Sequence, residues 1–277
     1  DVCSSDLNTG MNCSIHCPTK DIQVLKRWLE GSLLPLALIG LWEWTAIQGW
    51  LVAESVSHPS AIAKALVQVM MDGSLWTALA QTLGGAASGW LIASLAGTSV
   101  GVAFGLSRRL SKLMALSVET MRPIPSVALI PLALLIHGYG FKMEGSIVAF
   151  SSFWPVLIIT ESAVRGIEPR LLEVSKMLHL SLWQQTSKII LPAALPRIFV
   201  GLRLAAAVAL VVAVTVEITA NPQGLGYALI VAQESMRADR VFAFIAWIGL
   251  IGWGLNALLL RAQYRWFGRM GGWAETS

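Results

Sequence analysis

Six ionisable side chains lie inside the long apolar stretches of this chain, where their types could do chemistry. They are Glu43, Glu119, Arg122, Glu161, Arg203 and Glu217. A charged group at membrane depth is costly, so such residues usually line a solute pathway, pair with one another or relay protons. We take four of them as candidates for a translocation pathway, namely Arg122, Glu161, Arg203 and Glu217.

Simpler interpretations remain open for three of the six residues. Glu119 and Arg122 are three positions apart and could pair with each other on one helix. Arg203 lies near the cytosolic end of its stretch, where a long side chain can extend to the membrane surface.

The sequence contains no recognisable catalytic motif. It has no His-Glu-x-x-His, no Gly-x-Ser-x-Gly and no phosphate-binding glycine loop with a lysine, and its four histidines are scattered. Cys13 and Cys17 have a spacing that suits no common zinc or redox site. We therefore expect no catalytic residue, no metal and no cofactor, and any ATP that drives this protein would be bound by another chain.

The composition is that of an integral membrane protein. Of the 277 residues, 55% are hydrophobic and 13% are charged, and the mean hydropathy is +0.65. Soluble domains carry about 25% charged residues. Segments of roughly 20 apolar residues can cross a bilayer. We expect an all-α membrane protein with six transmembrane helices, at about 33–53, 77–105, 113–137, 144–164, 195–220 and 241–262.

The distribution of lysine and arginine predicts the orientation in the membrane. With the N-terminus inside, fourteen basic residues fall on the cytosolic side and four on the outer side, the latter being Lys64, Lys142, Arg237 and Arg240. Positive residues favour the cytosol. We therefore expect a multi-pass protein of the plasma membrane with cytosolic tails at 1–32 and 269–277 around a transmembrane domain at 33–268. Topology explains the basic charge, so nucleic acid need not be a partner.

The first residues need separate treatment. The codons for residues 1–7 would match the end of a common sequencing adapter. We hypothesise that residues 1–10 are an assembly artefact and that the protein starts at Met11.

Small residues and prolines predict how the helices pack. The second segment carries one small residue at every fourth position, namely Gly85, Gly89, Ala93, Gly97, Gly101 and Gly105. This spacing allows another backbone to approach closely, with or without a role in transport. The fifth segment repeats the pattern with Gly201, Ala205, Ala209 and Ala213, which places Glu217 on its packed face. Pro123, Pro125 and Pro131 should bend or break the third segment.

The longest cytosolic loop, 165–194, is expected to form two short amphipathic helices. Pro169 can open the first helix, and Leu171, Val174, Leu178 and Leu182 recur at helical spacing. Ser181 and Gln184 form a capping box for the second helix, which Leu191-Pro192 should end. Such a hairpin can dock a soluble partner, although a helix resting on the membrane surface has the same pattern.

Several strings, taken in order, resemble one family. They are LEVSKMLH at 172–179 and ILPAALP at 190–196, with LSRR at 106–109, RPIP at 122–125, ALIP at 128–131, the segment 192–203 and GLGY at 224–227. The loop resembles the cytoplasmic EAA loop of binding-protein-dependent ABC importer permeases, and the other strings are similar to the sulfonate, taurine and nitrate branch. The resemblance covers about residues 33–268.

The resemblance implies that the loop docks into an ATP-hydrolysing subunit. The residues it assigns to this contact are Leu171, Glu173, Val174, Ser175, Leu178, His179 and Pro192. Val174 and Ser175 replace two alanines of the family pattern, and His179 replaces a glycine. A glycine at a helix end usually adopts a left-handed conformation, so His179 puts the geometry of this turn in question.

The resemblance also implies the type I ABC importer permease fold and a set of partners. These are a second copy of the chain, two cytosolic ATPase subunits, a periplasmic or extracellular solute-binding protein and membrane lipid. The chain would translocate a small solute, such as a sulfonate, taurine or nitrate, by alternating access. The rival interpretations are a secondary transporter or channel without an ATPase, and a membrane enzyme, which the missing catalytic groups disfavour.

Overall fold

The computed structural model describes residues 34, 37–46, 48 and 57–268, and it divides into two compact units, Asp1–Ala53 and Glu54–Ser277. In the first unit, residues 37–46 are helical. Parts of the expected first span (33, 35, 36, 47 and 49–53), the tails at 1–32 and 269–277, and Cys13 and Cys17 lie outside the described residues. The total of six spans and the hypothesis about residues 1–10 therefore stay predictions.

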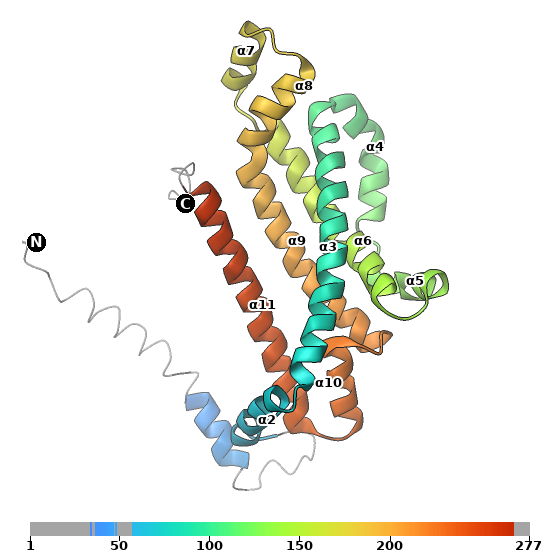
Figure 1. The fold of residues 1–277 in the computed structure, drawn as a ribbon, viewed down its shortest axis with the longest axis vertical. Helices are drawn as coiled ribbons and strands as arrows, with labels where there is room; N and C mark the ends of the chain where they lie inside the picture. The colour runs from blue at the N-terminus through green and yellow to red at the C-terminus, as the bar shows by residue number, and fades with distance from the viewer. Residues whose placement is uncertain (1–33, 35–36, 47, 49–56, 269–277) are drawn as a thin grey trace, which may run out of the picture. The chain divides into compact units, whose positions relative to one another are not determined.

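The described part of the second unit consists of helices joined by short connections, as the sequence predicts (Figure 1). The helices are α2 Pro59–Met71, α3 Ser74–Leu106, α4 Arg108–Met121, η1 Ser126–Leu129, α5 Ile130–His137, α6 Phe141–Arg165, α7 Pro169–Met177, α8 Leu182–Gln185, η2 Thr186–Ile190, α9 Leu191–Thr219, α10 Gly224–Glu234 and α11 Ala238–Phe267. Four helical stretches are long and apolar enough to span a membrane: Ser74–Leu106, Phe141–Arg165, Leu182–Thr219 and Ala238–Phe267.

The centre of this unit is the packing of α3 against α6 and of α6 against α9. The small-residue stripe of α3 makes the first of these contacts possible. A Cβ atom on Gly89 would lie 2.6 Å from the carbonyl oxygen of Gly145, and one on Gly97 would lie 2.9 Å from Cβ of Val156. These separations are too short for real side chains, so the stripe serves close helix packing within one chain, as its spacing predicts.

The third expected span is broken, as its prolines predict. Helix α4 and the stretch from η1 to α5 meet at an angle of 84° across residues 122–125. Pro123 and Pro125 lack the N–H groups that a continuous helix needs. Counted as one bent span, this pair brings the membrane crossings in the described part to five.

The hairpin between α6 and α9 differs in one respect from the expectation. Helix α7 begins at Pro169, and α8 begins with the expected capping box of Ser181 and Gln184. The prediction that Leu191-Pro192 ends the second helix is wrong, because α8, η2 and α9 run on as one helical stretch, Leu182–Thr219. In the π-helical turn η2 the Leu191 N–H donates to the Thr186 carbonyl, and this wider turn accommodates the proline that follows.

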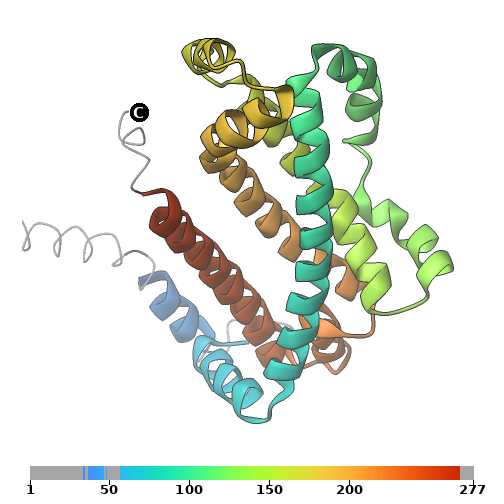
Figure 2. The ribbon, with the colours of Figure 1, turned by 45° about the horizontal axis from the view of Figure 1, so that its top comes forward.

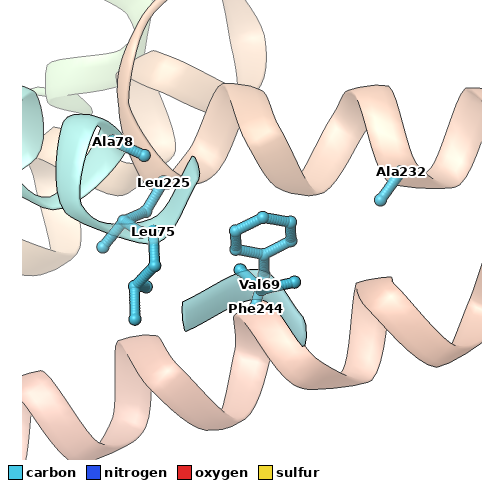
Figure 3. Close-up of a cluster of buried hydrophobic side chains, with 6 residues drawn as sticks. All are labelled: Val69, Leu75, Ala78, Leu225, Ala232 and Phe244. Atoms are coloured by element: carbon cyan, nitrogen blue, oxygen red, sulfur yellow. The ribbon is translucent and has the colours of Figure 1, made fainter. Parts of the chain in front are cut away.

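Two short helices that the sequence analysis did not identify close the opposite end of the unit. Figures 1 and 2 show α2 and α10 at the end away from the α7–α8 hairpin. A cluster of buried side chains joins α2, α3, α10 and α11 there (Figure 3), consisting of Val69, Leu75, Ala78, Leu225, Ala232 and Phe244. Both helices are too short to be recognised as spans, at 13 and 11 residues.

Candidate functional site

The α7–α8 hairpin exposes six large apolar side chains to solvent. We call these side chains the hairpin apolar surface: Leu171, Val174, Met177, Leu178, Leu182 and Trp183. Leu182 is 83% exposed and Trp183 is 80% exposed. An apolar surface of this kind on a projecting element marks a site that binds a partner or a membrane. The expected common face of Leu171, Val174 and Leu178 is therefore present and points outward.

The opposite side of α7 holds the hairpin against the body of the protein. Leu172 packs on the buried cluster formed by α6, η2 and α9, which includes Val164 and Ile190. Ser175 is buried, and its hydroxyl donates to the Leu172 carbonyl at 2.6 Å. Ser175 therefore holds the helix in place and does not belong to the exposed surface. Its predicted role in the partner contact is at most indirect.

Glu173 is exposed, and the expectation from the sequence that it lies in the first turn of its helix, where its charge would complement the helix dipole, is wrong. Helix α7 begins at Pro169 and has no acidic residue in its first turn, so Glu173 belongs to the second turn. The helix dipole acts mainly within the first turn. The carboxylate of Glu173 is therefore available for a partner, and its interaction with its own helix is weaker than expected.

His179 resolves the question about the turn between the two hairpin helices. Its φ is +49°, in the left-handed region that a glycine would occupy. The Leu180 N–H donates to the Ser175 carbonyl at 3.2 Å, the bond that marks a Schellman helix end. Histidine is among the non-glycine residues found in this region. The hairpin turn thus keeps its form without glycine.

A second group of polar residues is buried near the end of the bundle away from the α7–α8 hairpin. Glu144 of α6 is 2% exposed, Glu217 of α9 is 2% exposed and Asn221 is 1% exposed. The Asn221 amide donates to Glu144 Oε2 at 2.8 Å, and the Gly226 N–H donates to Glu217 Oε2 at 2.9 Å. Glu217 thus lies on the packed face of α9, where the small-residue spacing places it.

These bonds tie the turn before α10 to the bundle. The Gly224 N–H donates to Gln81 Oε1 at 3.0 Å, and the Leu225 N–H donates to the Thr82 hydroxyl at 2.9 Å. The first N–H groups of α10 have no partner within their own helix. They donate instead to two side chains of α3, Gln81 and Thr82, and to one of α9, Glu217. The sequence analysis missed Glu144 because it starts the fourth span at that residue. An acidic residue entering an apolar run is the signal that could have identified it.

Two substitutions at Glu217 should separate its charge from its hydrogen bond. Glu217→Gln and Glu217→Ala both remove the charge, but only glutamine keeps an acceptor for the Gly226 N–H. A buried N–H left without a partner costs about 1–3 kcal/mol. We expect the alanine variant to be less stable than the glutamine variant by about that amount, measured by thermal unfolding of the solubilised protein.

The matched control is the exposed Glu119, at which alanine and glutamine should differ by no more than about 0.5 kcal/mol. Equal stability of the two Glu217 variants would contradict a structural role for the bond to Gly226.

The other pathway candidates lie apart from this cluster and from each other. Glu161, near the C-terminal end of α6, pairs with Arg165 at 3.0 Å and accepts from the Ser111 hydroxyl at 2.7 Å. Arg203 donates to Gln263 Oε1 at 3.2 Å and links α9 to α11. Arg122 forms no ion pair with Glu119 or with any other residue that the structure describes. The four candidates therefore do not converge on a single site.

The chain matches a known family over residues 93–270, the family described as the binding-protein-dependent transport system inner membrane component. The chain belongs to this family. It is therefore a membrane-spanning permease of the ABC importer type, and the resemblance seen in the loop and in the other strings is confirmed.

Individual relatives and solved structures agree with this assignment. A putative aliphatic sulfonates transport permease of Bacillus subtilis (strain 168) is 31% identical over 81% of this chain and 82% of its own length. A taurine transport system permease of Escherichia coli (strain K12) is 32% identical over 73% of this chain and 75% of its own length. A crystal structure of an amino acid ABC transporter has a similar fold, with a TM-score of 0.60 at 19% identity over 72% of this chain and 97% of that one.

Proposed function

We propose that this permease imports a small anion of the sulfonate, taurine or nitrate class, as a homodimer that works with two cytosolic ATPase subunits and one external solute-binding protein. In this arrangement both termini and the hairpin face the cytosol. ATP is hydrolysed on the partner subunits, and the permease moves its solute by alternating access without changing it covalently. The transport functions of the sulfonate and taurine relatives support the class of solute.

The observation that carries the proposal is the hairpin apolar surface. A membrane-spanning bundle has no need to expose Leu182 and Trp183 on a projecting hairpin unless something covers them. The hairpin is held in place, because Ser181 and Gln184 cap the N-terminus of α8 with two reciprocal hydrogen bonds and Leu172 anchors α7 to the bundle. Because the hairpin connects α6 to α9 and ends in an apolar surface, it is suited to transmit movement from a soluble partner to these two helices.

Reconstitution of the complete transporter tests the proposal. The permease, co-expressed with its candidate ATPase and binding protein, should purify as a complex that contains both. In proteoliposomes this complex should take up taurine, an alkanesulfonate or nitrate only when ATP and the loaded binding protein are present. Uptake by the permease alone, driven by an ion gradient, would instead indicate a secondary transporter.

A further inference from the structure

We infer that the break in the third span forms a binding site for a small oxyanion in the middle of the membrane, with Arg122 as its cation and Trp154 as a second hydrogen-bond donor. The inference deepens the proposed function, on which it rests for the identity of the anion. It assigns a defined place in the permease to the solute.

A cavity of about 270 Å³ lies at this break. It is lined by Arg122, Ile124 and Ser126 from the broken span, by Phe150, Ser151, Trp154 and Pro155 of α6, and by Val208 and Val212 of α9. A water molecule takes up about 30 Å³ in the liquid. The cavity therefore has room for a small anion together with several waters.

The cavity lies at the middle of the bilayer. Helix α6 has 25 residues and is about 37 Å long at 1.5 Å per residue. Trp154 is near the centre of this helix, so roughly 20 Å of helix extends on either side of it. Because the hydrocarbon core is about 30 Å thick, lipid headgroups do not reach this depth. An anion found here has to be one that crosses the membrane.

Two of the donors that line the cavity have no acceptor among the described residues. Arg122 carries a full positive charge and pairs with no carboxylate in the part of the chain that the structure describes. The Trp154 indole Nε1–H is buried and has no hydrogen-bond partner among those residues. A buried donor without a partner costs free energy, and an unpaired arginine at this depth costs more. A bound anion would pair with the exposed guanidinium of Arg122, and the Trp154 indole, whose Nε1 is enclosed, would turn its N–H toward it.

The chemistry of these donors selects an oxyanion. The planar guanidinium of arginine matches the geometry of an oxygen pair on one central atom, as in nitrate or a sulfonate. The indole N–H and the Ser126 hydroxyl can each donate to a further oxygen. The remaining lining is apolar and aromatic, with Phe150 and Trp154 in edge-to-face contact at 5.7 Å between ring centroids. That lining suits the short alkyl chain of an alkanesulfonate.

The first test uses the full-length permease alone, in nanodiscs. Its unfolding temperature is measured in sodium methanesulfonate, sodium nitrate and sodium gluconate at equal ionic strength. A ligand that binds only the folded state raises this temperature, and we expect a rise of about 2–4 °C in the two small oxyanions relative to gluconate. Arg122→Gln should abolish the rise, and Trp154→Phe, which keeps the ring but removes the donor, should reduce it.

Matched controls exclude general effects of charge and of tryptophan loss. Arg261→Gln removes an arginine of α11, and Trp253→Phe removes an exposed indole of the same helix. Neither residue lines the cavity. Both variants should keep the full rise. Arg122→Lys keeps the charge but loses the planar guanidinium, so it should give an intermediate rise in unfolding temperature. This variant replaces Arg122→Gln in the test if the glutamine variant does not fold. The absence of a rise in the unaltered protein, or an equal rise in Arg122→Gln, would overturn the inference.

The second test separates this site from the function of the whole transporter. In the reconstituted complex, Arg122→Gln should lower uptake about tenfold or more, because a charge-assisted contact to the solute is lost, while the ATPase still co-purifies. Normal uptake by Arg122→Gln would overturn the site and leave the importer function intact. Failure of the unaltered complex to import would overturn the proposed function, whereas the binding test on the permease alone would still decide the site.

Discussion

Replacing Glu173 with lysine should abolish both uptake and co-purification of the ATPase, while the permease still inserts at its normal level. Glu173 is exposed on α7, next to Val174 of the hairpin apolar surface, so any partner that covers this surface meets its carboxylate. Like charges brought together at an interface cost several kcal/mol. The transmembrane helices are untouched by this change, and with Glu173 in the second turn of α7 the helix itself should lose little stability.

Three measurements check this prediction: membrane level by immunoblot, co-purification of the ATPase, and ATP hydrolysis stimulated by the loaded binding protein. Glu234→Lys provides the matched control, because Glu234 is an exposed glutamate at the end of α10, at the opposite end of the unit from the hairpin (Figure 1). This variant should keep its ATPase. A Glu173→Lys complex that retains both the ATPase and uptake would show that the hairpin does not couple ATP hydrolysis to transport.

Replacing Gly97 with leucine should prevent the protein from folding. A Cβ atom at this position would lie 2.9 Å from Cβ of Val156 and 3.0 Å from the Phe153 carbonyl oxygen. A whole leucine side chain cannot fit there unless α3 and α6 separate. Overpacking of this kind costs about 1–3 kcal/mol for extra methylene groups alone, and here it opposes the main helix contact of the bundle. We expect loss of monodisperse protein in size-exclusion chromatography after solubilisation.

Gly249→Leu is the control for this change, since a Cβ atom at Gly249 of α11 would have no other atom within 4 Å. That variant should be recovered like the unaltered protein. Normal recovery and transport of Gly97→Leu would show that the small-residue stripe of α3 is not needed for close packing.

The sequence predicts the main elements because their signals are local. Long apolar runs predict α3, α6, α9 and α11, since twenty apolar residues in succession have few alternatives to a transmembrane helix. Prolines at 123 and 125 predict the break in the third span, because a missing N–H acts at its own position whatever surrounds it. The capping box of α8 is equally local. Conversely, Pro192 does not end a helix, because the π-helical turn before it accommodates the ring.

The buried polar cluster and the cavity at the broken span are less predictable from the sequence. Glu217 appears there as a charged residue on a smooth helix face, but its bond to Gly226, nine positions later, depends on how α10 folds back. Glu144 and Asn221 are 77 residues apart and meet only because α6 and α9 are packed side by side. Arg122 and Trp154 likewise line one cavity because the break in the third span faces the middle of α6.

The sequence by itself thus determined that this is an all-helical membrane protein with a hairpin of two short helices, because periodicity, prolines and caps act over a few residues each. Only the tertiary structure decided which polar groups share a site and which of them lack a partner. Long-range packing brings α3, α6, α9 and the broken span together at distances that no local pattern encodes. For Arg122 and Trp154 that packing leaves two donors without an acceptor among the residues that the structure describes.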